Sequence, residues 1–270
     1  MIPDFSLTAW RQEVPWIRDY QVEQDLIISR ALINLYENPK IKDNLVFRGG
    51  TALNKLYIKP PARYSEDIDL VQTSSAPIGA MIDEIRMALS WLGEPIRKLT
   101  ERSAKLIYRY QASDNSRKKL KIEINTTEHF HFLDFVDHKF SVANSWFSGE
   151  SMLRTYQLNE LMGTKLRALY QRRKGRDLFD LWLVSKTNMI DHAAVLNIFL
   201  SHCERDHQKI TRALFEKSLF EKIQHEDFQY DILELLADKN AWSFEEACEV
   251  VKNKFICLLP GEPWKVKEKS

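Results

Sequence analysis

The chain has 270 residues, enough for one large domain or two small ones, and its 44% hydrophobic and 29% charged residues are typical of a globular protein. The formal net charge is only +1, so the protein as a whole does not attract nucleic acid, and any binding of nucleic acid would need local basic patches. No apolar run is long enough to span a membrane, and three separated cysteines with no leader-like N-terminus predict a cytoplasmic protein with reduced thiols.

The first third of the chain predicts a helix, a strand and a second helix in succession. Apolar residues at helical spacing predict an amphipathic helix over residues 21–37, which Asn38-Pro39 ends. A short apolar strand over residues 45–47 comes next. A further helix is predicted over residues 52–58, where Lys59-Pro60-Pro61 stops it.

The turn between that strand and the second helix is a candidate phosphate-binding segment. Gly49 and Gly50 permit a positive φ and let backbone N–H groups approach a phosphate closely. Thr51 adds a hydroxyl near the start of a helix, where exposed N–H groups favour anions. A Gly-Gly turn alone is more often an ordinary loop, so the phosphate-binding interpretation depends on a second motif nearby.

A pair of carboxylates in a predicted strand is that second motif. Because side chains alternate along a strand, Asp67 and Asp69 share one face, while Ile68 and Leu70 point to the other. Two carboxylates this close repel each other, and a cation between them explains the pair best. Carboxylate oxygens favour Mg²⁺ or Mn²⁺ over zinc. An exposed strand edge is the alternative for an Asp-x-Asp pattern taken alone.

The middle of the chain predicts a helix over residues 78–92 and strands over 104–110 and 120–125. In the last of these strands the apolar side chains share one face and the polar side chains share the other. Glu123 lies on the polar face, where it is either a solvated residue or a third carboxylate beside the pair.

Residues 156–186 predict helices, and two charged residues there have competing interpretations. Lys165 falls within an apolar stripe, where it either extends its ammonium group to water or reaches toward a triphosphate. The basic run 172–176 is a solvated turn or an RNA contact, and the earlier basic run 117–121 is likewise plain surface or an RNA contact. Asp177 either favours a helix start or faces an active site. From Asp191 onward the pattern is helical, and Ser243 is predicted to cap a helix.

The two early motifs together resemble a known signature. Their fuller strings are R-G-G-T-A-L-N-K-L-Y, from Arg48, and R-Y-S-E-D-I-D-L, from Arg63. They resemble the nucleotidyltransferase superfamily, and specifically the AbiEii/AbiGii toxin family, which includes the MenT-type toxins. The family's K-L-x-A-L context matches the residues from Lys165, and its R-D-L-x-D-L pattern favours Asp177 slightly over Asp180. The signature covers about residues 45–185.

The resemblance implies a mixed-sheet α/β fold, with a nucleotidyltransferase core over residues 1–150. A helical C-terminal region over residues 151–270 is expected to contribute to an active site between the two. The resemblance also implies three sets of residues. The implied metal ligands are Asp67, Asp69 and Glu123. The implied catalytic residues are these three acids with Lys165 and Asp177. The implied nucleotide-binding residues are Arg48, Gly49, Gly50, Thr51, Ser65 and Lys165.

The activity expected from the resemblance is Mg²⁺- or Mn²⁺-dependent transfer of a nucleoside monophosphate from an NTP to an acceptor hydroxyl. The expected acceptor is RNA, at the 3′ end of tRNA. The expected setting is a toxin–antitoxin or phage-defence pair with a cognate antitoxin. Two alternatives remain: an enzyme of this fold that modifies a protein or a small molecule, and a non-catalytic NTP-binding module.

Overall fold

The computed structural model describes residues 2–265, which form two compact units. The first unit ends at Gln157 and the second begins at Leu158. Strand β7 (Ser148–Tyr156) spans the division expected at residue 150 and belongs wholly to the first unit. Within the described part of the chain, no helix is both long and apolar enough to cross a membrane.

The first unit is built on one sheet of seven strands in the order β3-β4-β5-β2-β1-β7-β6. Pairs β2–β5 and β1–β7 are parallel, whereas β1–β2, β3–β4, β4–β5 and β6–β7 are antiparallel. The predicted mixed α/β class is therefore confirmed. Besides β7, the strands are β1 (Leu45–Arg48), β2 (Asp67–Gln72), β3 (Ile96–Leu99), β4 (Ser103–Gln111), β5 (Arg117–Asn125) and β6 (Phe135–Ala143).

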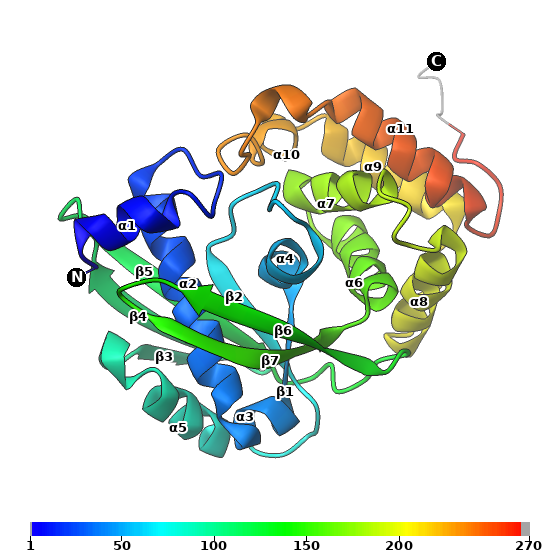
Figure 1. Ribbon diagram of the computed structural model, residues 1–270. Helices are drawn as coiled ribbons and strands as arrows, with labels where there is room; N and C mark the ends of the chain where they lie inside the picture. Colours follow the sequence, from blue (N-terminus) through cyan, green and yellow to red (C-terminus); the bar gives the residue numbers. More distant parts are fainter. Residues whose placement is uncertain (1, 266–270) are drawn as a thin grey trace. The chain divides into compact units, whose positions relative to one another are not determined.

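Helix α2 (Asp19–Glu37) is the main helix of this unit and packs against β7 (Figure 1). Its apolar side chains, among them Leu26 and Ile33, are fully buried, which is why it extends as one helix until Asn38 and Pro39 end it. The other helical segments are α1 (Asp4–Trp10), α3 (Pro39–Asn44), α4 (Gly49–Ala52), the π-helical turn η1 (Leu53–Tyr57), α5 (Gly79–Ala88) and the 3₁₀ turn η2 (Ser90–Leu92).

Two of these segments differ from their predictions. The helix predicted over residues 52–58 begins instead at Gly49 and changes into η1 after one turn. The helix predicted over residues 78–92 ends at Ala88, and η2 comes after it.

A buried carboxylate in α2 connects the N-terminal segment to η1. Asp25 accepts hydrogen bonds from the indole N–H groups of Trp10 and Trp16, each at 3.0 Å. Lys55, in η1, donates to Asp25 Oδ1 at 2.7 Å and to Ser29 Oγ at 2.9 Å. Because Asp25 and Ser29 both accept hydrogen bonds from Lys55, the segment after the glycine turn is held against α2.

The second unit is helical, as predicted. The helical stretch expected over residues 156–186 is divided at residues 172–174, within the basic run for which a solvated turn was one interpretation. Ser243 caps α11 by accepting a hydrogen bond from the backbone N–H of Glu246 at 3.2 Å. The helices are α6 (Leu158–Gln171), α7 (Gly175–Ser185), α8 (His192–Arg205), α9 (Arg212–Ile223), α10 (Glu226–Tyr230) and α11 (Phe244–Lys254), with 3₁₀ turns at Lys239–Ala241 and Ile256–Leu258.

Candidate active site

The glycine turn leads directly from β1 into α4 and lies against the end of β2. Gly49 has a φ of +80°, a conformation that side chains with a Cβ disfavour. A Cβ at Gly49 would lie 2.2 Å from Asp69 Oδ2. The predicted proximity of the glycine turn to the carboxylate pair is therefore confirmed for Asp69.

A buried arginine supports the same turn from the other side. A Cβ at Gly50 would lie 2.1 Å from Nη2 of Arg63, whose side chain is 2% exposed. Asn54 connects the two segments, since its Nδ2 donates to the Gly50 carbonyl at 3.0 Å and its Oδ1 accepts from the Arg63 backbone N–H at 3.3 Å. No role was predicted for Arg63, because nothing in a loop sequence indicates which distant backbone it will contact.

The two aspartates lie on one face of β2, as the alternation predicted. Ile68 and Leu70 are buried on the opposite face, while Asp67 and Asp69 are partly exposed. The antiparallel pairing of β1 and β2 places Arg48 directly opposite Asp69. The pair, the turn and Arg48 thus meet at one end of two adjacent strands.

Three of the other residues predicted to bind nucleotide, Arg48, Thr51 and Ser65, lie in this region but have protein partners. The Thr51 hydroxyl lies 2.6 Å from Ser65 Oγ and also donates to the backbone carbonyl of Asp67. Arg48 Nη1 lies 2.6 Å from Glu128 Oε2. Burial disfavours the charged guanidinium, but Glu128, Tyr156 and Asp69 together outweigh it and raise the pKa of Arg48. Thr51 and Ser65 therefore fix the start of β2 to the glycine turn.

Glu123 faces the same side of the sheet as the aspartates, and two lysines hold it. In the parallel pair β2–β5 it lies opposite Asp69. Lys105 Nζ lies 3.0 Å from one of its oxygens, and Lys121 Nζ lies 3.2 Å from the other and 2.9 Å from Asp67 Oδ2. Burial acts to raise the pKa of Glu123, but the hydrogen bonds and charges of the two lysines outweigh it and lower the pKa. Glu123 is therefore ionised at neutral pH.

The donor set at this end of the sheet suits a hard divalent cation. Asp67 and Asp69 offer carboxylate oxygens from one face, and Mg²⁺ is commonly held by one or two carboxylates together with substrate phosphates. No group of three His, Cys, Asp or Glu side chains among residues 2–265 is close enough to hold a metal by itself. Each oxygen of Glu123 already contacts a lysine, and its role as a third ligand stays a prediction.

Lys165 and Asp177, the other predicted catalytic residues, belong to the second unit and contact each other. Lys165 is 5% exposed and lies 3.3 Å from Asp177 Oδ1 and 2.8 Å from Asp180 Oδ2, and both acids are fully buried. Arg172 adds a bond of 2.7 Å to Asp177 Oδ2. Lys165 is therefore buried and paired, rather than extended to water. The catalytic role of this cluster stays a prediction.

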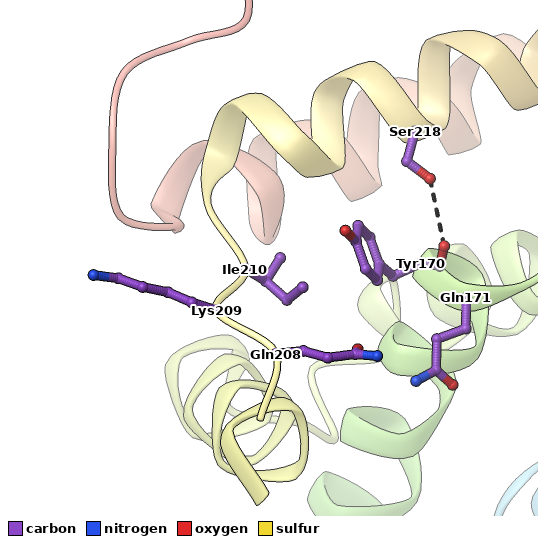
Figure 2. A pocket seen from close by; sticks show the side chains of 6 residues that line it. All are labelled: Tyr170, Gln171, Gln208, Lys209, Ile210 and Ser218. Carbon is purple, nitrogen blue, oxygen red and sulfur yellow. Dashed lines mark hydrogen bonds between the residues drawn. The ribbon is translucent and has the colours of Figure 1, made fainter. Parts of the chain in front are cut away.

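The second unit also has an open hollow of about 520 Å³. Figure 2 shows it between the end of α6 and α9, where Ser218 donates a hydrogen bond to the Tyr170 carbonyl at 3.4 Å. None of its lining residues is acidic, so it offers no carboxylate ligand for a hard cation and no carboxylate base. It is lined by Tyr170, Gln171, Gln208, Lys209, Ile210 and Ser218.

Comparisons with known proteins agree with this geometry. A family model described as "Nucleotidyl transferase AbiEii toxin, Type IV TA system" matches residues 30–250. MenT4, a nucleotidyltransferase toxin of Mycobacterium tuberculosis, has a similar fold, with a TM-score of 0.62 and 18% identity over 96% of this chain and 91% of that one. A protein of H. pylori described as a candidate nucleotidyltransferase aligns with a TM-score of 0.53 and 18% identity, over 88% of this chain and 94% of that one. Among curated proteins, none matches the sequence significantly. Because the family match spans most of the sequence and includes the glycine turn and both aspartates, the chain belongs to the AbiEii family of nucleotidyltransferase toxins.

Proposed function

We propose that this toxin transfers a nucleoside monophosphate from an NTP to a hydroxyl of RNA, specifically at the 3′ end of tRNA. The observation that supports the proposal most directly is the contact between the Asp69 carboxylate and the glycine turn. It brings a candidate phosphate cradle and candidate metal ligands to one place, as transfer from a polyphosphate requires.

In the proposed reaction the acceptor oxygen bonds to the α-phosphorus, and the bond from that phosphorus to the oxygen bridging to the β-phosphorus breaks. Pyrophosphate leaves, and the hydroxyl proton passes to a base. Glu123 is the predicted base, although the lysines that lower its pKa make it a weak one. Release from Lys121 during substrate binding would strengthen it.

The binding roles are assigned to residues at the end of β1 and β2. The backbone N–H groups of Gly49 and Gly50 would bind the β- and γ-phosphates. Asp67 and Asp69 would hold a Mg²⁺ or Mn²⁺ ion, which when bound supplies charge neutralisation to the triphosphate. The motif around Lys165 implies a phosphate-binding role, for which its ammonium group would have to exchange Asp177 or Asp180 for a phosphate.

Family membership implies a cognate antitoxin. We propose that the toxin and its antitoxin act in phage defence, with tRNA as the toxin's target in the cell. A neighbouring reading frame that encodes a small DNA-binding protein would support this arrangement.

The test is incubation of the full chain with each labelled NTP, Mg²⁺ and total tRNA, followed by separation of RNA, protein and small molecules. Asp67→Asn and Asp69→Asn should abolish transfer, while Asp43→Asn, a change at an exposed carboxylate of the same unit, should leave it intact. Equal transfer by all three variants would contradict the proposed roles of the two aspartates.

The same experiment separates the alternatives. Label on protein or on a small hydroxylated compound, with RNA unlabelled, would select a different acceptor. Nucleotide binding without transfer to any acceptor would select a binding module. The second outcome is disfavoured because a retired site has no physical need to keep two repelling aspartates on one face.

A further inference from the structure

The strands on one side of β2 carry an exposed row of cations. Along β5 the side chains at alternate positions share the face of Asp67 and Asp69, and the cross-strand partners in β4 and β3 extend this face outward. Six cations lie there with a single acid, Glu123. We call this surface the basic face; its cations are Lys98, Lys105, Arg109, Arg117, Lys119 and Lys121.

Two pairs on the basic face set like charges directly opposite each other. Arg109 in β4 pairs in register with Lys119 in β5, and Lys105 in β4 pairs with Lys98 in β3. Like charges in this position destabilise a sheet, so local stability does not explain the arrangement. An anion bound across the strands would remove the repulsion.

The outer part of the face has no internal counter-charge. Lys98, Arg109, Arg117 and Lys119 are exposed, and none forms an ion pair with a carboxylate of residues 2–265. Lys105 and Lys121 are instead neutralised in part by Glu123. The hairpin at the other edge of the sheet shows the ordinary pattern, where exposed Lys139 pairs with Glu150 at 2.9 Å.

We propose that the basic face binds the phosphate backbone of the acceptor RNA. The inference rests on the proposed function, and it adds the surface on which the acceptor lies. Strand β5 is the neighbour of β2, and Lys121 contacts Asp67, so the inner end of the face adjoins the carboxylate pair. Strand β3 forms the outer edge of the face. It lies three strand steps from β2, which is about 14 Å at ~4.8 Å per step.

The chemistry of the face fits a polyphosphate. The cations are spread over three strands, matching a repeating charge rather than one anionic group. They are also local, since the net charge of the chain is only +1. Phosphate contacts of this kind release counterions, so their number is measurable as the slope of log affinity against log salt concentration.

The experiment measures binding of fluorescein-labelled tRNA to the full chain by anisotropy, at salt concentrations from about 50 to about 300 mM, without NTP. The test variant is Arg109→Gln with Lys119→Gln. The matched control is Arg97→Gln with Arg102→Gln, which removes two exposed, unpaired cations from β3 and the turn after it. Arg97 is a close control because it neighbours Lys98 in β3 but points to the opposite face.

The test variant should lower the magnitude of the salt slope by about 2 and weaken binding at about 0.1 M salt by about tenfold to 100-fold. The control should keep the native slope. The thermal midpoint of the test variant should equal or exceed the native value, because a repulsive pair is removed.

Three results would overturn the proposal. They are an unchanged slope in the test variant, an equal loss in the control, and no binding of tRNA by the native chain. If tRNA does not bind, label transfer to protein or to a small molecule would still support nucleotidyl transfer, and only the proposed RNA-binding surface would be refuted. Absence of label on every acceptor would refute the proposed function as well.

Discussion

Replacing Gly49 by alanine should damage both the stability and the activity of the first unit. The residue has a φ of +80°, and a Cβ there would lie 2.2 Å from Asp69 Oδ2 and 3.0 Å from Asp69 Cβ. The carboxylate cannot simply swing aside, because its own Cβ is also too close. We therefore expect both backbone strain and displacement of the aspartate.

The magnitude combines three effects. A side chain at this φ costs about 1–3 kcal/mol, and overpacking adds about 1–3 kcal/mol. The less flexible unfolded chain returns about 0.4–1 kcal/mol. The net loss should be about 3 kcal/mol in the free energy of unfolding.

The assay is urea unfolding followed by tryptophan fluorescence, together with the labelled-NTP transfer assay. Gly79→Ala is the matched control, because Gly79 begins α5 and a Cβ there meets nothing within 4 Å. It should leave stability unchanged or slightly higher. A Gly49→Ala chain that unfolds at the native urea concentration and transfers label at the native rate would refute the contact between the turn and Asp69.

Three further predictions concern buried groups. Asp177→Asn leaves Lys165 with only Asp180 in a buried site, so the free energy of unfolding should fall by about 3 kcal/mol in urea titrations. Burial acts to raise the pKa of Asp177, but Lys165 and Arg172 outweigh it and lower the pKa. The ionised Asp177 therefore stabilises the fold fully above the unfolded pKa of about 4, and this contribution is lost as pH falls through the native pKa. Asp177→Asn should flatten the acid limb of a curve of unfolding free energy against pH. Burial raises the pKa of Cys203 to about 11, so this thiol should react with iodoacetamide at about pH 8 far more slowly in the native chain than in urea, by mass spectrometry; equal rates would contradict its burial.

Local periodicity was sufficient for much of the fold. The alternation of Asp67 to Leu70 predicted which side chains are buried, because the two-residue repeat of a strand does not depend on its neighbours. The cap at Ser243 was predictable for the same reason, since its partner lies three residues away. The apolar face of α2 was predictable from its helical spacing.

Features that depend on distant contacts were not predictable. The close approach to Gly175 is one case, since a Cβ there would lie 2.2 Å from the carbonyl of Phe228, a residue far away in the sequence. The helix predicted after the glycine turn is in part a π-helical turn, whose Lys55 reaches Asp25 in α2. No local pattern encodes either contact.

The residues of the candidate site also divide into those predictable from local sequence and those that depend on distant contacts. The sequence indicated the glycine turn and the acids, but not Arg63 against Gly50 or Lys121 between Asp67 and Glu123. A lysine two residues from a glutamate on a polar strand face was visible in the sequence. That it would also reach Asp67 required the register of β5 on β2, which is a non-local property.

The strand order explains why one carboxylate pair adjoins both a candidate phosphate cradle and a basic face. Strand β2 has β1 on one side, which delivers the glycine turn, and β5 on the other, which begins the basic face. In the proposed reaction, the triphosphate and the acceptor backbone would therefore approach Asp67 and Asp69 from opposite sides along the sheet. Because side chains alternate, a slip of one residue in the β2–β5 register would set Asp69 beside a buried isoleucine in place of Glu123. The burial of Ile122 and Ile124 thus holds the polar residues of β5 beside the aspartates, and the core of the first unit sets the chemistry of its surface.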